Sequence, residues 1–181
     1  QKQKVKSNYR QVSYQRPAAN PANTVRKSQI DPIYLPQMVS YSSNEKPGTI
    51  VIDTSKRFLY LVQPGGKAMR YGVGVGKQGF SWKGSQRISR KAKWPTWTPP
   101  KTMIARERKK GRILPARMEG GINNPLGARA LYLGSTLYRI HGTNQPWTIG
   151  KAMSSGCIRM RNEDVTDLYE RVPVGAKVVV R

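Results

Sequence analysis

HGTNQPWTIGKAMSSGCIRMR, residues 141–161, carries the only histidine and the only cysteine of the chain. Both lie among glycines, small polar residues and arginines rather than in an apolar run. A thiol becomes a nucleophile when a nearby base or positive charge favours its thiolate, and imidazole is the usual base near neutral pH. His141 and Cys157 therefore predict an enzyme with a cysteine nucleophile, whose fold must bring the two residues together.

The alternative for Cys157 is a structural role, because free cysteine is among the most buried residue types. The local sequence SSGC at 154–157 argues against that role. Small residues leave room for a substrate and for accessible backbone N–H groups. We therefore favour a reactive cysteine over a buried structural one.

The chain of 181 residues has a formal charge of +24, from 33 Lys and Arg against 9 Asp and Glu. Such a charge favours polyanionic or carboxylate-rich partners, and nucleic acid is the rival candidate. However, the basic residues are spread along the chain and match no zinc-finger, RNP-type or basic-zipper pattern. A nucleic acid partner is therefore not expected.

A single cysteine excludes an internal disulfide and a cysteine-rich metal site, and we expect no metal or other cofactor. No stretch approaches the roughly 20 apolar residues of a transmembrane segment. The chain starts at Gln1, without an initiator methionine or a signal peptide. If the protein is exported, we expect its signal peptide to be absent from this chain.

Residues 1–47 are predicted to form an irregular basic arm or linker. They are rich in Gln, Asn, Ser and Pro, with eight basic residues against two acidic ones. This composition buries too little apolar surface to offset the entropy of ordering. The segment is interpreted as a flexible linker or as an electrostatic tether to an anionic polymer. Its more apolar part, residues 30–39, is the part expected to lie extended on the domain.

Residues 48–181 are predicted to form one β-rich domain. Short runs rich in β-branched and aromatic residues indicate strands at 49–53, 57–63, 67–75, 128–133, 136–140 and 177–181, with further short ones within 80–93 and at 157–160. Turn signals such as Pro64-Gly65-Gly66 separate these runs. His141 directly follows one of the predicted strands, which should hold it at a strand end.

Two short helices are expected. Residues 101–110 (KTMIARERKK) predict a helix with a strongly basic face. Asn162 is expected to cap a second helix, because Glu163 and Asp164 suit a first turn. An apolar stripe follows at Val165, Leu168, Tyr169 and Val172. Since helical crossovers are missing, we expect a mainly β fold, a mixed or antiparallel sandwich or partly open barrel, rather than parallel βαβ units.

The glycines at 72, 74, 76 and 79 give a weak signal for a phosphate-binding loop. They are followed by neither a G-K-[ST] motif nor a helical pattern. Glycine within a strand more often marks a bulge or a close backbone approach.

Two motifs resemble those of the L,D-transpeptidase family, also called YkuD-like or ErfK/YbiS-like. That family carries a His-Gly motif and, after a loop, a [Ser/Thr]-x-Gly-Cys-aliphatic-[Arg/Asn] motif, which read here IHGT at 140–143 and SSGCIRM at 154–160. The likeness extends to GTIVIDTSKRFLYLV, YGVGVGK, NNPLGARALYLG and VPVGAKVVV, and covers residues 48–181. The chain departs from the family at Ser155, where many members have a second histidine, and around 82–84, where a frequent Thr-Pro-x-Gly turn is replaced.

The resemblance implies a β-sandwich-like catalytic domain that transfers acyl groups between peptidoglycan stem peptides. Cys157 would attack the carbonyl of the diamino acid at stem position three, with departure of the terminal D-Ala. The side-chain amine of another stem would then attack the thioester and form a 3-3 cross-link. His141 would act as base and acid. The resemblance also places the protein in the periplasm or cell envelope of a bacterium, where other anionic polymers are further partners.

The expected oxyanion and substrate site comprises Gly156, Arg159, Ser154, Ser155, Gly142, Thr143, Tyr138 and Trp147. Backbone N–H groups near Gly156 and Cys157 are the candidates for an oxyanion hole, since small residues allow close approach. Arg159 has the planar fork that pairs with a carboxylate.

Three roles stay open. Ser154 either orients His141 or caps a turn. Tyr138 and Trp147 either line the groove or pack in the core. A third member of a catalytic triad is not identified, and a backbone carbonyl is one candidate.

Two alternative functions use the same site: hydrolysis of the thioester by an L,D-carboxypeptidase, and attachment of an envelope protein to peptidoglycan. The alternative from another class is a basic protein that binds nucleic acid or another polyanion, with an unreactive Cys157. The charge of +24 fits an envelope rich in carboxylates and phosphates.

Overall fold

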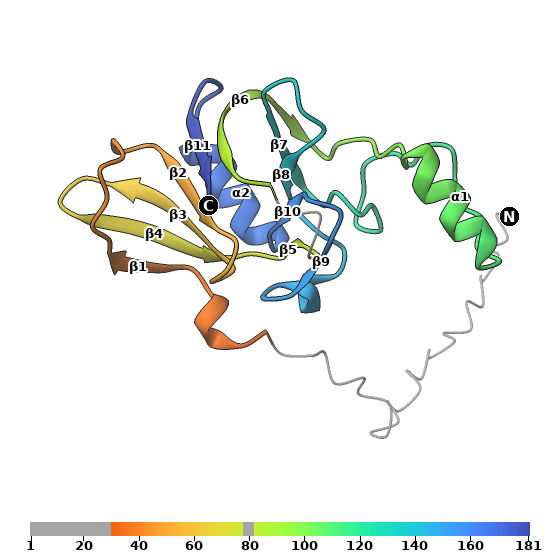
Figure 1. The fold of residues 1–181 in the computed structure, drawn as a ribbon, viewed down its shortest axis with the longest axis horizontal. Coiled ribbons are helices and arrows are strands. Elements are labelled where there is room, and N and C mark those ends of the chain that lie inside the picture. Colours follow the sequence, from red (N-terminus) through yellow and green to blue (C-terminus); the bar gives the residue numbers. More distant parts are fainter. Residues whose placement is uncertain (1–29, 78–81) are drawn as a thin grey trace, which may run out of the picture.

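The computed structural model describes residues 30–77 and 82–181. Strands dominate this part of the chain, as Figure 1 shows. The strands are β1 (Gln37–Ser40), β2 (Ile50–Asp53), β3 (Phe58–Gln63), β4 (Lys67–Gly72), β5 (Val75–Gly76), β6 (Gly84–Lys93), β7 (Arg129–Leu133), β8 (Arg139–His141), β9 (Ala152–Ser154), β10 (Ile158–Arg159) and β11 (Lys177–Val180). The α-helices are α1 (Lys101–Lys109) and α2 (Asn162–Arg171), and short 3-10 turns are η2 (Pro32–Tyr34) and η3 (Pro146–Thr148). The predictions of a mainly β fold with two short helices are confirmed.

One mixed sheet runs through the described residues in the order β1-β4-β3-β2-β11-β6-β7-β8-β10, and β5 and β9 form a separate parallel pair. Most neighbours are antiparallel, but β2 pairs in parallel with β11, and β8 with β10. The long strand β6 joins two halves, because residues 84–87 pair with β11 and residues 88–93 with β7. The register shifts between Ile88 and Arg90, and such an irregularity bends a strand.

The main core lies between these two halves and includes the apolar stripe of α2. Ile50 and Ile52 of β2 are fully buried in it, together with Leu131 of β7 and Leu168 of α2. Val51 lies between the two isoleucines and faces a second apolar cluster on the other side of the sheet. This alternation follows from the two-residue period of a strand. The predicted stripe on the second helix is confirmed, and Figure 1 shows α2 between the two groups of strands.

The second apolar cluster is covered by residues that the sequence placed in the irregular arm. β1 pairs in antiparallel fashion with β4. The ring of Tyr41 stacks on Tyr60 at 4.5 Å between centroids, and Tyr34 lies 5.4 Å from Phe58. The expectation that part of residues 30–39 lies extended on the domain is confirmed for residues 37–39. The interpretation of the whole arm as irregular was wrong for β1, because the segment is rich in prolines and polar residues and few of its side chains face the sheet. Residues 1–29 of the predicted arm lie outside the described residues, and the domain boundary at residue 48 stays a prediction.

Tyr34 also supports the loop that precedes the cysteine motif. A Cβ placed on Gly72 would lie 2.4 Å from Cβ of Tyr34, and one on Gly150 would lie 2.4 Å from the Tyr34 ring. Arg57 donates a hydrogen bond of 2.8 Å to the carbonyl of Gly150. The tyrosine thus joins the N-terminal segment, the first half of the sheet and the loop at residue 150.

We expect Tyr34→Ala to lower the free energy of unfolding by about 2 kcal/mol, because it empties a half-buried aromatic site. Urea unfolding measures the change. The matched control is Ile33→Ala, whose side chain is 49% exposed in the same turn and should hardly matter. Equal midpoints for the two variants would contradict the packing of this segment on the sheet.

Candidate active site

The paired strands β8 and β10 hold the two motifs side by side. Ile158 stands opposite Ile140 and Arg159 opposite His141, and the N–H of Met160 donates to the carbonyl of His141 at 2.8 Å. Both isoleucines are buried in the main core. Since side chains alternate along a strand, His141 and Arg159 lie on the opposite face from these isoleucines.

The imidazole of His141 is held in one tautomer. Its Nδ1 lies 2.6 Å from the carbonyl oxygen of Gly142. Because a carbonyl oxygen only accepts, Nδ1 carries the proton of the neutral ring and Nε2 keeps its lone pair. The carbonyl of Gly142 is thus the group that orients the ring, which is the backbone-carbonyl candidate left open by the sequence.

Burial lowers the pKa of His141 to about 3, and the positive charges of Arg159 and Arg139 act in the same direction, while the hydrogen bond to Gly142 opposes them. The residue is only 4% exposed. His141 is therefore neutral near pH 7 and presents Nε2 as a base.

Cys157 precedes β10 directly and is half-buried. Its Sγ lies 3.9 Å from the carbonyl oxygen of Leu137. Within the described residues, no hydrogen bond joins Sγ to the ring of His141. Cys157 and the neutral imidazole are accordingly not hydrogen-bonded to each other in this structure, and catalytic hydrogen bonds often tighten only in the substrate complex.

Ser154 organises the turn that leads to the cysteine. Its Oγ accepts from the N–H of Gly156 at 3.2 Å and donates to the carbonyl of Cys157 at 2.6 Å. Gly156 has a φ of 110°, which favours glycine. Of the two roles open for Ser154, the structure shows the turn cap. Because the N–H of Gly156 is occupied, the N–H of Cys157 is the better placed of the two expected oxyanion donors.

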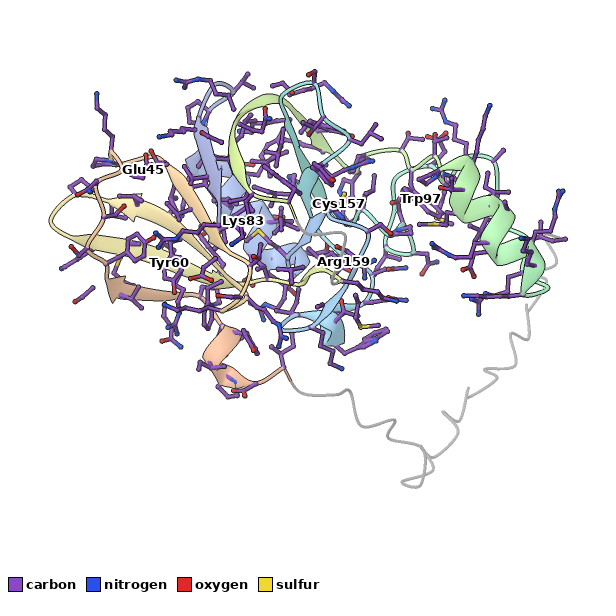
Figure 2. All side chains as sticks on the ribbon, in the orientation of Figure 1. Glu45, Tyr60, Lys83, Trp97, Cys157 and Arg159 are labelled. Carbon is purple, nitrogen blue, oxygen red and sulfur yellow. The ribbon has the colours of Figure 1, made fainter. Side chains whose placement is uncertain are left out.

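Arg159 is half-buried beside the cysteine, and Figure 2 shows both residues between the β1–β4 end and α1. Burial lowers the pKa of its guanidinium, and Cys157 opposes that effect. Its side chain forms no ion pair within the described residues, so the guanidinium is open to an anionic ligand. Its backbone forms two hydrogen bonds of 2.8 Å with Gly74. A Cβ on Gly74 would lie 3.1 Å from the carbonyl of Thr148, so this glycine serves close approach, as the pattern favoured.

The other predicted residues separate into two groups. Gly142 and Thr143 are buried in the turn after β8, where Thr143 Oγ1 accepts from the N–H of Gln145 at 3.0 Å. Tyr138 packs against the main core and stacks on Trp82 at 5.1 Å between centroids, which favours its packing role. Trp147 is 48% exposed in η3, and Ser155 is exposed in the turn. No hydrogen bond of these last two side chains with Cys157 or His141 occurs in the described residues.

Asn162 holds the loop after His141, a role that the sequence missed. It is the first residue of α2 and Arg161 is the N-cap, so the predicted capping role was wrong. Its Oδ1 instead accepts from the N–H of Ala128 at 3.0 Å and of Thr143 at 3.2 Å. A Cβ on Gly127 or on Gly142 would lie 2.2 Å from this oxygen. The two glycines are the sequence signal for a side chain inserted between their backbones.

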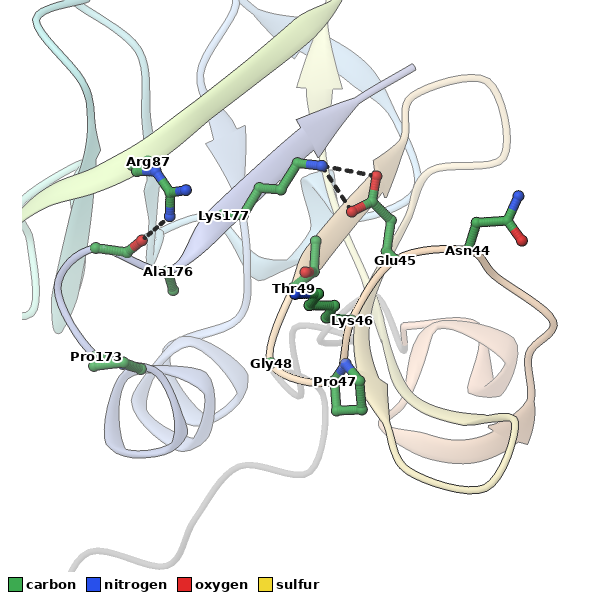
Figure 3. A pocket seen from close by; sticks show the side chains of 11 residues that line it. Asn44, Glu45, Lys46, Pro47, Gly48, Thr49, Arg87, Pro173, Ala176 and Lys177 are labelled. Carbon is green, nitrogen blue, oxygen red and sulfur yellow. Dashed lines mark hydrogen bonds and ion pairs between the residues drawn. The ribbon is translucent and has the colours of Figure 1, made fainter.

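A surface hollow of about 610 Å³ lies elsewhere, between residues 44–49 and 173–177. Figure 3 shows the ion pair at its edge, where Nζ of Lys177 lies 2.8 Å from a carboxylate oxygen of Glu45. None of the predicted site residues lines this hollow. The chemistry of the Cys157 motif, rather than hollow size, therefore locates the candidate site.

The described residues contain no group of three or more His, Cys, Asp or Glu side chains with the arrangement of a metal site. Neither of their helices has the length and apolar character of a membrane span.

We expect both tautomers of His141 to be populated in Asn162→Ala. The substitution removes the hydrogen bond to the N–H of Thr143 and so releases the turn whose Gly142 carbonyl accepts the hydrogen bond from Nδ1. Nitrogen-15 NMR reads this directly, since the chain has one histidine. Asn162→Asp keeps the acceptor oxygen and should keep the Nδ1–H form. An unchanged tautomer in a folded Asn162→Ala variant would contradict this positioning role.

The low pKa of His141 predicts a loss of stability in mild acid. The folded pKa of about 3 lies below the ordinary value of about 6.5, so the unfolded chain takes up the proton first as the pH falls. The contribution of the neutral His141 to the free energy of unfolding is complete above the pKa of the unfolded chain. It is lost as the pH falls towards the folded pKa, by about 2 kcal/mol between about pH 8 and pH 5.

Urea midpoints across this window measure that loss, above the range in which ordinary carboxyl groups titrate. The control is His141→Gln, which removes the titrating group and should flatten the slope. Equal slopes in the two proteins would rule out a buried neutral imidazole.

Comparisons with known proteins assign the chain to a family. A family model described as YkuD, L,D-transpeptidase catalytic domain, matches residues 47–180. The probable L,D-transpeptidase YbiS of Escherichia coli K12 is 37% identical over 148 residues, which cover 80% of this chain and 47% of that protein. The probable L,D-transpeptidase ErfK/SrfK of the same strain is 36% identical, over 81% of this chain and 47% of its own length. The chain thus spans about half the length of these curated relatives.

Solved structures agree on the fold. A crystal structure described as a probable carnitine operon oxidoreductase from Brucella melitensis is 54% identical, covers 84% of this chain and 96% of its own, and has a TM-score of 0.55. L,D-transpeptidase 3 from Mycobacterium tuberculosis is 16% identical, covers 74% of this chain and 60% of its own, and has a TM-score of 0.55, which shows a shared fold. From the family match and the curated relatives, this chain belongs to the YkuD family of L,D-transpeptidase catalytic domains.

Proposed function

We propose that this chain forms 3-3 cross-links between peptidoglycan stem peptides through a thioester on Cys157. The observation that carries the proposal is the buried His141 at the end of β8, the strand that pairs with β10. Its Nδ1–H donates a hydrogen bond to the carbonyl of Gly142. That geometry leaves Nε2 free to act as the proposed base for the one cysteine of the chain. Membership in the family supplies the substrate class.

The proton follows a cycle through His141. Nε2 takes the thiol proton as Sγ of Cys157 attacks the carbonyl of the donor stem. Burial and two arginines disfavour the charged ring, as the pKa of about 3 indicates, so the imidazolium readily gives the proton to the leaving amine of D-Ala. The acceptor amine then attacks the thioester, loses a proton to Nε2, and the thiol is restored.

Two groups stabilise the charges of this reaction. The N–H of Cys157, free among the described residues, is the proposed donor to the tetrahedral oxyanion, and such a donor typically contributes about 3 kcal/mol. The open guanidinium of Arg159 pairs with a carboxylate of the donor stem. The proposed setting is the periplasm or cell envelope, where the charge of +24 favours anionic polymers.

We expect Cys157→Ala to abolish dimer formation from purified tetrapeptide muropeptides, with a loss of roughly 10³-fold or more. Mass-resolved chromatography of the digest measures dimers and shortened monomers separately. The matched control is Met153→Ala, a half-exposed position on β9, which should retain activity.

Four other outcomes would correct the proposal. Undiminished dimer in Cys157→Ala would show that the cysteine is not the nucleophile. Tripeptide monomers without dimers in the unaltered protein would identify hydrolysis, and a product joined to a protein amine would identify protein attachment. Salt-sensitive DNA binding without any turnover would favour the polyanion-binding alternative.

A further inference from the structure

Helix α1 stands apart from the rest of the described structure. None of its residues is buried. Figure 1 shows it at one end of the long axis, beyond β7, β8 and β10, with β1–β4 at the other end. A nine-residue helix with no buried residue is marginal in water, so α1 contributes little to the core.

Carboxylates neutralise only one side of this helix. Glu107 forms ion pairs with Arg106, Lys110 and Arg112. Lys101, Arg108 and Lys109 are exposed and have no carboxylate partner among the described residues. All nine Asp and Glu of the chain lie in the described ranges, so the rest of the chain offers no acidic side chain to these three cations.

The three unpaired cations share one face. Their spacing, with Ile104 and Ala105 between them, is i, i+3, i+4, i+7 and i+8, which is a single stripe of an α-helix. The same five residues line a surface hollow of about 420 Å³. We call this stripe the α1 basic face: Lys101, Ile104, Ala105, Arg108 and Lys109.

Local stability explains only part of this arrangement, because Arg108 and Lys109 lie in the last turn, where cations complement the helix dipole, but Lys101 lies in the first turn. Pro100 provides no side-chain cap, and the first turn has no acidic residue but begins with Lys101. A cation at a helix N-terminus opposes the helix dipole, and like charges on one face repel each other. Each of these features weakens an isolated helix, and an anionic ligand would relieve the repulsion.

We propose that the α1 basic face is a docking surface for the carboxylate-bearing peptidoglycan polymer, separate from the cysteine site. The identity of this polymer rests on the proposed function. Charge complementarity favours a polyanion, and the stripe offers little apolar area for insertion into a bilayer, because Ile104 is half-buried and Ala105 is small. Figure 1 shows α1 on the side of the molecule that carries β8 and β10, and Cys157 directly precedes β10.

Co-sedimentation of the full chain with purified sacculi tests this surface. All variants carry Cys157→Ala, so that binding is measured without turnover. The test variant is K101Q/R108Q/K109Q. The control is R106Q/K110Q/R112Q, which removes the same charge from the carboxylate-paired side. We expect the first to weaken binding by about tenfold, as for the loss of three exposed ion pairs, and the second by about twofold or less. Raised salt should abolish the difference.

Equal losses in the two variants would overturn the proposal, because total charge alone would then explain binding. Circular dichroism checks α1, and K101R/R108K/K109R, which keeps the charges, should restore binding if charge is the cause. A loss confined to DNA or to phosphatidylglycerol vesicles, with sacculus binding intact, would also overturn it. In the catalytically active protein, the test substitutions should slow cross-linking of sacculi but not of soluble muropeptides. The sedimentation assay measures binding without turnover, so its result remains interpretable even if the proposed reaction of Cys157 proves wrong.

Discussion

The hydrogen bond from Nδ1 of His141 to the carbonyl of Gly142 is the constraint on which the site depends. It fixes the tautomer, leaves Nε2 free, and keeps a nearly buried ring without a charge. The turn that provides this carbonyl is in turn held by Asn162, whose oxygen lies between the backbones of Gly127 and Gly142. Asn162 at the start of α2 thereby positions the His141 ring through the Gly142–Thr143 turn.

The rest of the fold holds β8 beside β10. The isoleucines of these strands are buried in the main core, so the opposite face receives His141 and Arg159. Gly74 lets β5 approach Arg159, and Ser154 closes the turn before Cys157. The proposed chemistry therefore lies at β10, the last strand of the sheet, where one face is packed in the main core and the opposite face carries His141 and Arg159.

Most strands and both helices were predictable, because periodicity acts over short stretches of chain, and the two motifs that the sequence singled out do lie side by side. Three features were not predictable. Tyr34 and Tyr41 face the sheet from a proline-rich segment whose composition resembles a linker, and only tertiary packing reveals their role. Asn162 looked like an ordinary helix cap, because its partners Ala128 and Thr143 are distant in sequence. Which cations of α1 are paired with Glu107 and which are not depends on side-chain contacts, and the net charge of the sequence does not reveal these contacts.

The central claim is that a neutral His141 activates Cys157 for acyl transfer. Intact-mass spectrometry of the protein after brief incubation with a tetrapeptide donor tests it most directly. The account predicts one adduct, equal to the donor minus D-alanine, located on Cys157 by peptide mapping and absent from His141→Gln. Rapid product formation with no adduct, or an adduct of equal yield in His141→Gln, would contradict it.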